Sequence, residues 1–163
     1  MTMFSPQYWQ KKGIPGLGPN QQGLERYVDN YIENLVRLCR VLHRKLRDDG
    51  SMYINIDDSI NGRKKGNTNG LKDQHSTIGS QKKGAEAAHV DVDKYPQEGY
   101  PDQGFLGIPF RLADRLQREV GFVWRANIIW DPPNGMPNGG PSRPNTCHEY
   151  VLYFTKSSKR SLS

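Results

Sequence analysis

The sequence predicts an α/β fold with a mainly parallel sheet, on the strength of three observations. A short apolar start, Met3-Phe4, runs directly into Ser5-Pro6. Between residues 24 and 46, apolar residues recur at three- and four-residue steps, which is typical of an amphipathic helix. Ser51–Asp57 then alternates apolar and polar side chains, as a half-buried strand does. A strand, a long helix and a second strand in this order favour two parallel strands joined by a helix.

The totals are compatible with one soluble domain and an anionic partner. At 163 residues the chain can form a real core, although a hydrophobic share of 34% leaves much of it as loop or surface. The net charge of +6 and a pI near 9.4 suit a nucleic-acid partner, and they suit an ordinary basic protein equally well. Cys39 and Cys147 are too few for a disulfide framework and lack metal-ligand spacing, so no metal is expected. No signal peptide and no apolar run of about 20 residues is present, which predicts a cytoplasmic protein without a membrane partner.

The first element ends in the unusual stretch Ser5-Pro6-Gln7-Tyr8-Trp9. Proline fixes its own φ and biases Ser5 towards an extended conformation, so a stiff loop should follow the strand. This loop would present a hydroxyl, a carbonyl without a local partner and a flat aromatic face. Those groups can hold a planar ring that bears an amine, such as a nucleobase. A plain strand end with its aromatic side chains buried in the core would explain the same residues.

The helix that follows should end at Asp48-Asp49-Gly50, with Gly50 as a left-handed cap. Its C-terminal half is rich in arginine and lysine, which favour the negative end of the helix dipole, and a solvated face explains them better than DNA contact. Because the carboxyl ends of parallel strands meet at one edge of a sheet, Ser5-Pro6 and Asp57-Asp58-Ser59 should lie together there.

Residues 60–104 are polar and hold little that could form a core. The stretch from Arg63 to Lys83 contains six basic residues and one acidic residue, whereas the stretch from Glu86 to Asp102 is rich in acids. A segment of this length without regular structure is either functional or disordered. Both a DNA-facing flap and an unstructured insertion remain open.

Regular structure is predicted again from residue 105 onward. Residues 105–120 have the spacing of a short amphipathic helix, with Pro109 in its first turn, where proline is tolerated. Phe122–Trp130 is an apolar strand, and the proline- and glycine-rich residues 131–141 form a loop. The last strand, Tyr150–Thr155, is expected to pair antiparallel with the strand before it.

Taken together, five segments resemble the DNA amino-methyltransferases of the circularly permuted class, in which the catalytic half precedes the cofactor half. The segments are Ser5–Trp9, similar to S-P-P-Y-W; Asp49–Ser59, similar to D-G-x-hydrophobic-x-x-N-I-G-D-S; Leu106–Ala113, similar to L-x-G-I-P-W-R-L-A; Ile128–Pro137, similar to I-I-W-x-K-P-N-P-M-P; and His148–Lys156, similar to H-E-Y followed by three hydrophobic residues and F-T-K. The resemblance implies an incomplete Rossmann-like sheet of an S-adenosyl-L-methionine-dependent methyltransferase, mostly parallel with an antiparallel C-terminal strand. Residues 1–163 would form one domain, the catalytic half, with the polar insertion at about 60–104.

The resemblance also implies a mechanism for the first segment. The exocyclic amine of cytosine or adenine is conjugated with its ring and is therefore a poor nucleophile. The Ser5 hydroxyl and the Pro6 carbonyl would accept hydrogen bonds from that amine and direct its lone pair at the methyl donor, by positioning and electrostatics. Tyr8 would stack on a base rotated out of the duplex. Serine at the first position favours cytosine-N4 over adenine-N6 as the target, and both remain open.

Further site residues follow from the same resemblance. Ser5, Asp57 and Asp58 are expected to contact S-adenosyl-L-methionine. Double-stranded DNA is the expected partner. The residues expected to contact it are Trp9, Arg63, Lys64, Lys65, Lys82, Lys83 and Arg143.

The chain also departs from the family pattern. Gln7 stands at the second proline and could loosen the loop, Asp57 replaces a glycine, and Asp131-Pro132 displaces a basic residue. The glycine-rich D-P-F-x-G-S-G-T loop that receives the cofactor has no counterpart among the 163 residues. The resemblance therefore implies a catalytic half, prokaryotic or phage-encoded, that could need a second chain supplying the cofactor-binding half. A non-catalytic DNA-binding remnant that uses residues 63–83, or a purely structural fragment, would also fit.

Overall fold

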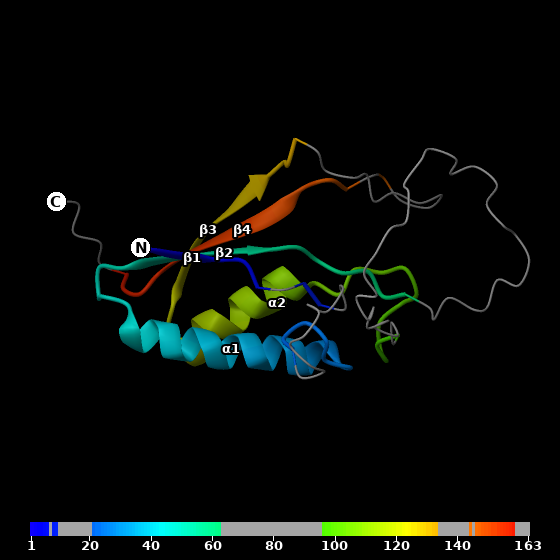
Figure 1. Ribbon diagram of the computed structural model, residues 1–163, viewed down its shortest axis with the longest axis horizontal. Coiled ribbons are helices and arrows are strands. Elements are labelled where there is room, and N and C mark those ends of the chain that lie inside the picture. Colours follow the sequence, from blue (N-terminus) through cyan, green and yellow to red (C-terminus); the bar gives the residue numbers. More distant parts are fainter. Residues whose placement is uncertain (7, 10–20, 63–95, 134–143, 145, 159–163) are drawn as a thin grey trace, which may run out of the picture.

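Two helices pack on one face of a four-stranded sheet in the computed structural model, which describes residues 1–6, 8–9, 21–62, 96–133, 144 and 146–158 (Figure 1). In chain order, the elements are β1 (Thr2–Phe4), α1 (Val28–Lys45), β2 (Ser51–Ile56), α2 (Ile108–Arg115), the π-helical turn η1 (Leu116–Val120), β3 (Val123–Trp130) and β4 (Glu149–Thr155). No helix among the described residues is long and apolar enough to cross a membrane.

The sheet has the order β1-β2-β4-β3. β1 is parallel to β2, whereas β4 is antiparallel to both of its neighbours. β1, β2 and β3 therefore run in one direction and only β4 runs against them. The predicted antiparallel C-terminal strand is confirmed. The prediction of a mostly parallel sheet is wrong for the pairs of neighbours, because the reversed strand lies between β2 and β3 instead of at an edge, so that two of the three pairs are antiparallel.

The start of α1 is held by a contact far along the chain, whereas its C-terminal end is set by the local backbone. Its first N–H group, that of Val28, donates to Gln97 Oε1 at 2.8 Å. At the other end Leu46 is extended, with φ −73° and ψ 140°. Gly50 does not have the predicted left-handed conformation, since it is not among the glycines with positive φ. Lack of space explains the glycine at this position instead. A Cβ on residue 50 would lie 2.6 Å from Leu46 Cγ and 2.8 Å from the Arg47 carbonyl oxygen.

The start of α2 is tied to the end of β2. The Asp58 carboxylate accepts hydrogen bonds from the backbone N–H groups of Gly107, at 2.9 Å, and Ile108, at 3.0 Å. It thus satisfies N–H groups that the first turn of a helix leaves without partners. Pro109 lies in that first turn, as predicted. The helical segment ends at Gly121, which has a left-handed φ of 93°.

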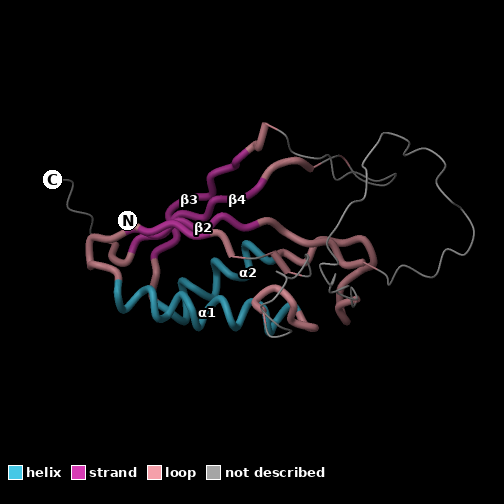
Figure 2. Tube along the Cα trace, in the orientation of Figure 1, coloured by secondary structure: helices cyan, strands magenta, loops and turns pink. Residues whose placement is uncertain are grey.

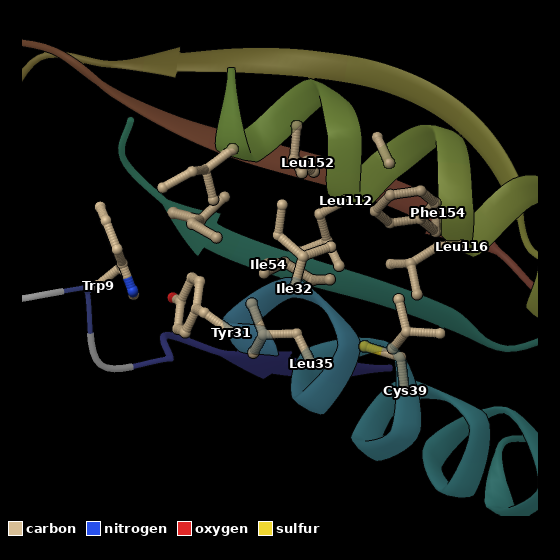
Figure 3. Packing of buried hydrophobic residues seen from close by; sticks show 14 of the residues in the cluster. Trp9, Tyr31, Ile32, Leu35, Cys39, Ile54, Leu112, Leu116, Leu152 and Phe154 are labelled. Atoms are coloured by element: carbon tan, nitrogen blue, oxygen red, sulfur yellow. The ribbon is translucent and has the colours of Figure 1, made fainter. Parts of the chain in front are cut away.

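The core lies between the helices and the sheet face that they cover (Figures 2 and 3). Alternate residues of β2 and β4 point into it, and the apolar stripes of α1 and α2 meet them. The side chains at its centre, each at most 1% exposed, are Tyr31, Ile32, Leu35, Cys39, Met52, Ile54, Ile56, Leu112, Leu116, Leu152 and Phe154. Cys39 is a free thiol that packs in this core, and burial raises its pKa to about 12.

Two buried amides close the base of the polar insertion. Asn61 and Gln97 are 4% and 6% exposed. The backbone N–H of Gln97 donates to Asn61 Oδ1 at 2.7 Å, and Asn61 Nδ2 donates to the Tyr100 carbonyl at 2.8 Å. These bonds tie the two ends of the insertion together, and Gln97 Oε1 links them to the start of α1 by accepting from the Val28 N–H. The basic stretch 63–83 itself lies outside the described residues.

Candidate active site

Four segments meet at one edge of the sheet, which we call the carboxyl edge: the C-terminal ends of β1, β2 and β3 and the N-terminal end of β4. Phe4 pairs with Ile54, so Ser5-Pro6 leaves the sheet next to the end of β2. The register between β3 and β4 sets Trp130 opposite Glu149 at the same edge. The structure thus brings Ser5-Pro6 and the end of β2 together, as the sequence predicted.

Tyr8 lies at this edge in a network of hydrogen bonds. Its hydroxyl donates to Asn55 Oδ1 at 3.2 Å. Burial raises the pKa of Tyr8 well above its usual value, and a hydrogen bond with the Glu149 carboxylate and the negative charge of Asp57 raise it further. The Ser5 hydroxyl also hydrogen-bonds with Tyr8. Tyr8 is therefore neutral at physiological pH. Its single O–H proton lies between two acceptors, Asn55 Oδ1 and the Glu149 carboxylate, while its oxygen accepts from the Ser5 hydroxyl.

The two residues with expected catalytic roles differ in their exposure. Ser5 is exposed and Pro6 is buried. The Ser5 hydroxyl can therefore meet a ligand, while its neighbour fixes the path of the backbone. Asn55, which accepts the hydrogen bond from Tyr8, is only 4% exposed and lies on β2 itself. A rigid strand thus supports the tyrosine that contacts Ser5.

Asp58 has a structural task at this edge. Its Oδ1 accepts from the N–H groups of Ser59, at 2.8 Å, and Ile108, while its Oδ2 accepts from Gly107. Burial raises the pKa of Asp58, whereas these N–H groups and Arg111 act in the opposite direction. Because both oxygens hold the backbone, we leave Asp58 out of the cofactor site proposed below. Asp57 is half-buried and accepts a hydrogen bond from the Asp58 N–H at 2.7 Å.

Trp9 lies in the core rather than on a DNA-facing surface. It is 4% exposed, and its indole N–H donates to the Glu25 carbonyl at 2.8 Å. Figure 3 shows it at one end of the apolar cluster, near Tyr31. The expected DNA contact of Trp9 is thus replaced by packing, since a buried ring has little surface to offer a nucleic acid. Gln7 and the remaining candidates for DNA contact lie outside the described residues, namely Arg63, Lys64, Lys65, Lys82, Lys83 and Arg143.

A cavity in the described part of the chain lies at the opposite end of the sheet from Ser5. It is lined by Met1, Leu46, Arg47, Asp49, Gly50 and Ser51. None of these residues contributes to the network around Tyr8, so we do not include the cavity in the candidate site.

Comparison with known proteins shows the family of this chain. A family model described as a DNA methylase, of the N6/N4 methyltransferase type, matches residues 1–162. The chain belongs to this family. Members of the N6/N4 DNA methylase family use S-adenosyl-L-methionine.

Similar proteins include two type II methyltransferases. The chain is 35% identical over 156 residues to M.Cfr9I of Citrobacter freundii, covering 95% of this chain and 47% of that protein. It is 35% identical over 159 residues to M.SmaI of Serratia marcescens, covering 97% and 49%. The chain thus spans about half the length of the curated relatives that it matches.

The fold of this N6/N4 methylase chain is similar to a solved structure, the cytosine-N4-specific PvuII DNA methyltransferase. The TM-score is 0.53 at 17% sequence identity, and the match covers 96% of this chain and 42% of that one. At this identity the likeness concerns the fold. It is consistent with the α/β architecture of the described residues.

Asn55 and Glu149 are two site residues that the sequence analysis did not predict. Both lie in segments that resemble the methylase family, yet neither segment predicts a contact with Tyr8. For Asn55 a signal exists, because an amide within an otherwise apolar strand needs a partner when buried. Glu149 could not be found from the sequence, since its place depends on β4 lying beside β2.

Proposed function

We propose that this chain is the catalytic half of a DNA methyltransferase that transfers a methyl group from S-adenosyl-L-methionine to the exocyclic amine of a flipped base. The observation that carries the proposal is the exposed Ser5 hydroxyl beside a neutral Tyr8, which Asn55 and Glu149 hold in place. Cytosine-N4 is the proposed target, and adenine-N6 is the alternative.

The roles of the first residues follow from the chemistry of the amine. Its lone pair is delocalised into the ring, and hydrogen bonds accepted from its two N–H groups pull that density back onto nitrogen. The Ser5 hydroxyl and the Pro6 carbonyl are the acceptors. Because both stand on a stiff loop after β1, the amine meets them in a fixed orientation. Tyr8 offers its ring to the flipped base, while its hydroxyl keeps the ring in place.

The acidic groups at the carboxyl edge suit the charges of the reaction. S-adenosyl-L-methionine carries a sulfonium and supplies the methyl group. Asp57 and Glu149, both close enough to Tyr8 to raise its pKa, give this edge a negative potential that favours a cationic donor. When the amine nitrogen bonds to the methyl group, the bond from that methyl to sulfur would break, and the positive charge would pass from the sulfonium to the amine. The same carboxylates would stabilise that charge until the amine loses a proton to solvent. Asp57 and Ser5 thus form part of the cofactor site, and the rest comes from the half with the glycine-rich loop.

The target base and the biological setting rest on further observations. Serine opens the first motif, and the solved structure with a similar fold is described as cytosine-N4-specific. The net charge of +6 suits double-stranded DNA as the partner. The similar type II methyltransferases suggest a role in restriction and modification.

A methyl-transfer assay tests the proposal. The chain is incubated with tritiated S-adenosyl-L-methionine and a pool of DNA duplexes, alone and together with the half of M.Cfr9I that it does not match. Digestion to nucleosides then separates N4-methylcytosine from N6-methyladenine. We expect label in N4-methylcytosine only when both halves are present. Salt-sensitive DNA binding without label under any condition would overturn the proposal in favour of a DNA-binding remnant.

A pair of serine variants assigns the chemistry to the carboxyl edge. Ser5→Ala should lower the rate about 10²- to 10³-fold, as removal of one group that stabilises a transition state does. The exposed Ser158, beyond the C-terminal end of β4, provides the matched control. Ser158→Ala should leave the rate unchanged. Equal rates for the two variants would remove Ser5 from the mechanism.

A further inference from the structure

A series of hydrogen bonds runs along the carboxyl edge from Ser5 to Glu149. The Ser5 hydroxyl donates to the Tyr8 oxygen, and the Tyr8 hydroxyl lies between two acceptors, the Glu149 carboxylate and, at 3.2 Å, Asn55 Oδ1. Ser5 is exposed, whereas Tyr8 and Glu149 are half-buried. The series therefore begins where a ligand can reach it and continues into the protein.

The strand register explains why these side chains meet. β1 and β4 lie on the two sides of β2. Phe4 pairs with Ile54, so Ser5 leaves the sheet beside the last residues of β2. On the other side the pairing with β4 runs to Ile56, the last residue of β2, so Glu149, the first residue of β4, lies just beyond it. The sheet thus brings a hydroxyl and a carboxylate from distant parts of the sequence to one place.

The two proposed acceptors of the amine differ in what they can do with a proton. In the proposed reaction both N–H groups of the amine point at protein atoms, the Ser5 hydroxyl and the Pro6 carbonyl. A backbone carbonyl only accepts hydrogen bonds, whereas a hydroxyl accepts one and donates another at the same time. Ser5 can therefore take a proton from the amine while it gives its own proton to the next group.

The far end of the series has one suitable proton acceptor. The amide oxygen of Asn55 accepts a hydrogen bond and stays unprotonated at neutral pH, while an ionised carboxylate can bind the proton itself. Asp57 acts on Tyr8 through its charge, and its carboxylate accepts the N–H of Asp58 at 2.7 Å. The Glu149 carboxylate is thus the group that can receive a proton from Tyr8.

We propose that Ser5, Tyr8 and Glu149 form a proton path for the methylated amine. This inference rests on the proposed function and gives the route by which the released proton reaches solvent. The N–H bond breaks as its proton bonds to the Ser5 oxygen, the Ser5 proton passes to the Tyr8 oxygen, and the Tyr8 proton passes to Glu149. The amine loses its positive charge, Ser5 and Tyr8 end neutral as they began, and Glu149 returns the proton to water. Glu149 is a positioning residue for the transfer and its proton acceptor.

The hydrogen bonds are tested in the 163-residue chain alone. Tyrosine is labelled with carbon-13 at Cζ, and Tyr8→Phe identifies the Tyr8 signal in the NMR spectrum. We expect this signal to shift as Glu149 is protonated between pH 8 and pH 4, and Glu149→Gln should abolish the shift. Asp57, Asp58 and His148 are titratable neighbours among the described residues, so Asp57→Asn is the matched control and should keep the shift. An identical shift in folded Glu149→Gln would overturn the path.

Kinetics test the role of the path in methyl transfer, with the unmatched half of M.Cfr9I and duplex DNA present. Glu149→Gln keeps a hydrogen-bond acceptor that cannot bind the proton, and Tyr8→Phe keeps the ring and breaks the path. Each should lower the maximal rate about 10²-fold, as loss of a general base does. The double variant should lose little more than either single variant, because both changes break one path. Glu119→Gln, on an exposed residue of η1, should leave the rate unchanged.

The pH dependence separates a proton path from a purely structural role. At saturating S-adenosyl-L-methionine, which removes the contribution of Asp57 to cofactor binding, the rate should fall at low pH as Glu149 becomes protonated. The Glu149→Gln variant should lack this fall, since it has no group to protonate there, and circular dichroism reports whether it is folded. The same fall in both proteins, or losses that add up in the double variant, would overturn the path.

The two experiments separate this inference from the proposed function. Methyl transfer by the unaltered chain, with a Tyr8 signal that does not respond to Glu149, would keep the proposed function and remove the proton path. A Tyr8 signal that responds to Glu149 without methyl transfer under any condition would leave the hydrogen bonds in place and remove both the proposed function and the role of the path.

Discussion

The two faces of the sheet are built from the same strands and differ in what covers them. On the face towards the helices, Ile54 and Phe154 are fully buried. One residue away on the same strands, Tyr53 and Tyr153 are half-buried. They lie on the opposite face of the sheet, which we call the open face because neither α1 nor α2 lies over it (Figure 1). The side chains on the covered face are therefore packed against α1 and α2 and form the core. The open face has no helix of the described residues over it, so the two tyrosine rings keep part of their surface exposed.

The largest expected loss of stability comes from a substitution on the covered face. Phe154→Ala removes a buried ring from the centre of the core and should lower the free energy of unfolding by about 3–5 kcal/mol. Tyr153→Ala removes a ring of similar size from the open face and should cost about 1 kcal/mol, mostly through the lost stacking with Tyr53. Urea denaturation followed by circular dichroism measures both values. Equal losses would show that the open face contributes to stability as a core does.

The next effect concerns Asp58, which joins the start of α2 to the end of β2. Asp58→Ala leaves three backbone N–H groups without their acceptor and should lower stability by about 1–3 kcal/mol. Asp58→Asn keeps one carbonyl oxygen and should lose less. The same urea titration measures both variants. A neutral Asp58→Ala would mean that α2 is held in place by packing alone.

Periodicity predicts the helices and strands of this chain well, because the buried side of each element shows in the spacing of its own apolar residues. The order of the strands depends on long-range pairing, and nothing near residues 149–155 shows that β4 inserts between β2 and β3. Glu149 was missed for that reason. Tyr8 and Trp9 show the same limit on a smaller scale, since adjacent aromatic residues point one to the site and the other to the core. The sequence predicted a left-handed backbone conformation as the reason for a glycine at residue 50. The structure gives another reason, because neighbouring atoms leave no room for a Cβ there.

A smaller effect is expected where the polar insertion joins the fold. Replacing residues 63–95 by a short glycine and serine linker should change stability by no more than about 1 kcal/mol, because loop length has a weak effect on closure entropy and Asn61 and Gln97 hold the ends together. Gln97→Ala should cost more, since it removes the acceptor of the Val28 N–H. Thermal unfolding compares the two proteins. A large loss for the linker protein would show that the insertion contributes to the core.

The smallest expected effect concerns an ion pair between α1 and α2, the two helices that cover one face of the sheet. Glu33 on α1 accepts a hydrogen bond from Arg115 on α2, and this bond lowers the pKa of Glu33. The native pKa therefore lies below the unfolded value of about 4.3. The contribution to stability is present above that value and is lost as the pH falls through the native pKa. Glu33→Gln should cost at most about 0.5 kcal/mol at pH 7, since the pair is partly exposed and screened, and the difference from the unaltered chain should vanish in strong acid. Urea midpoints from pH 2 to pH 7 measure this. A difference that stays constant over the range would mean that Glu33 acts through packing rather than charge, and that the covered face needs no ion pair between its helices.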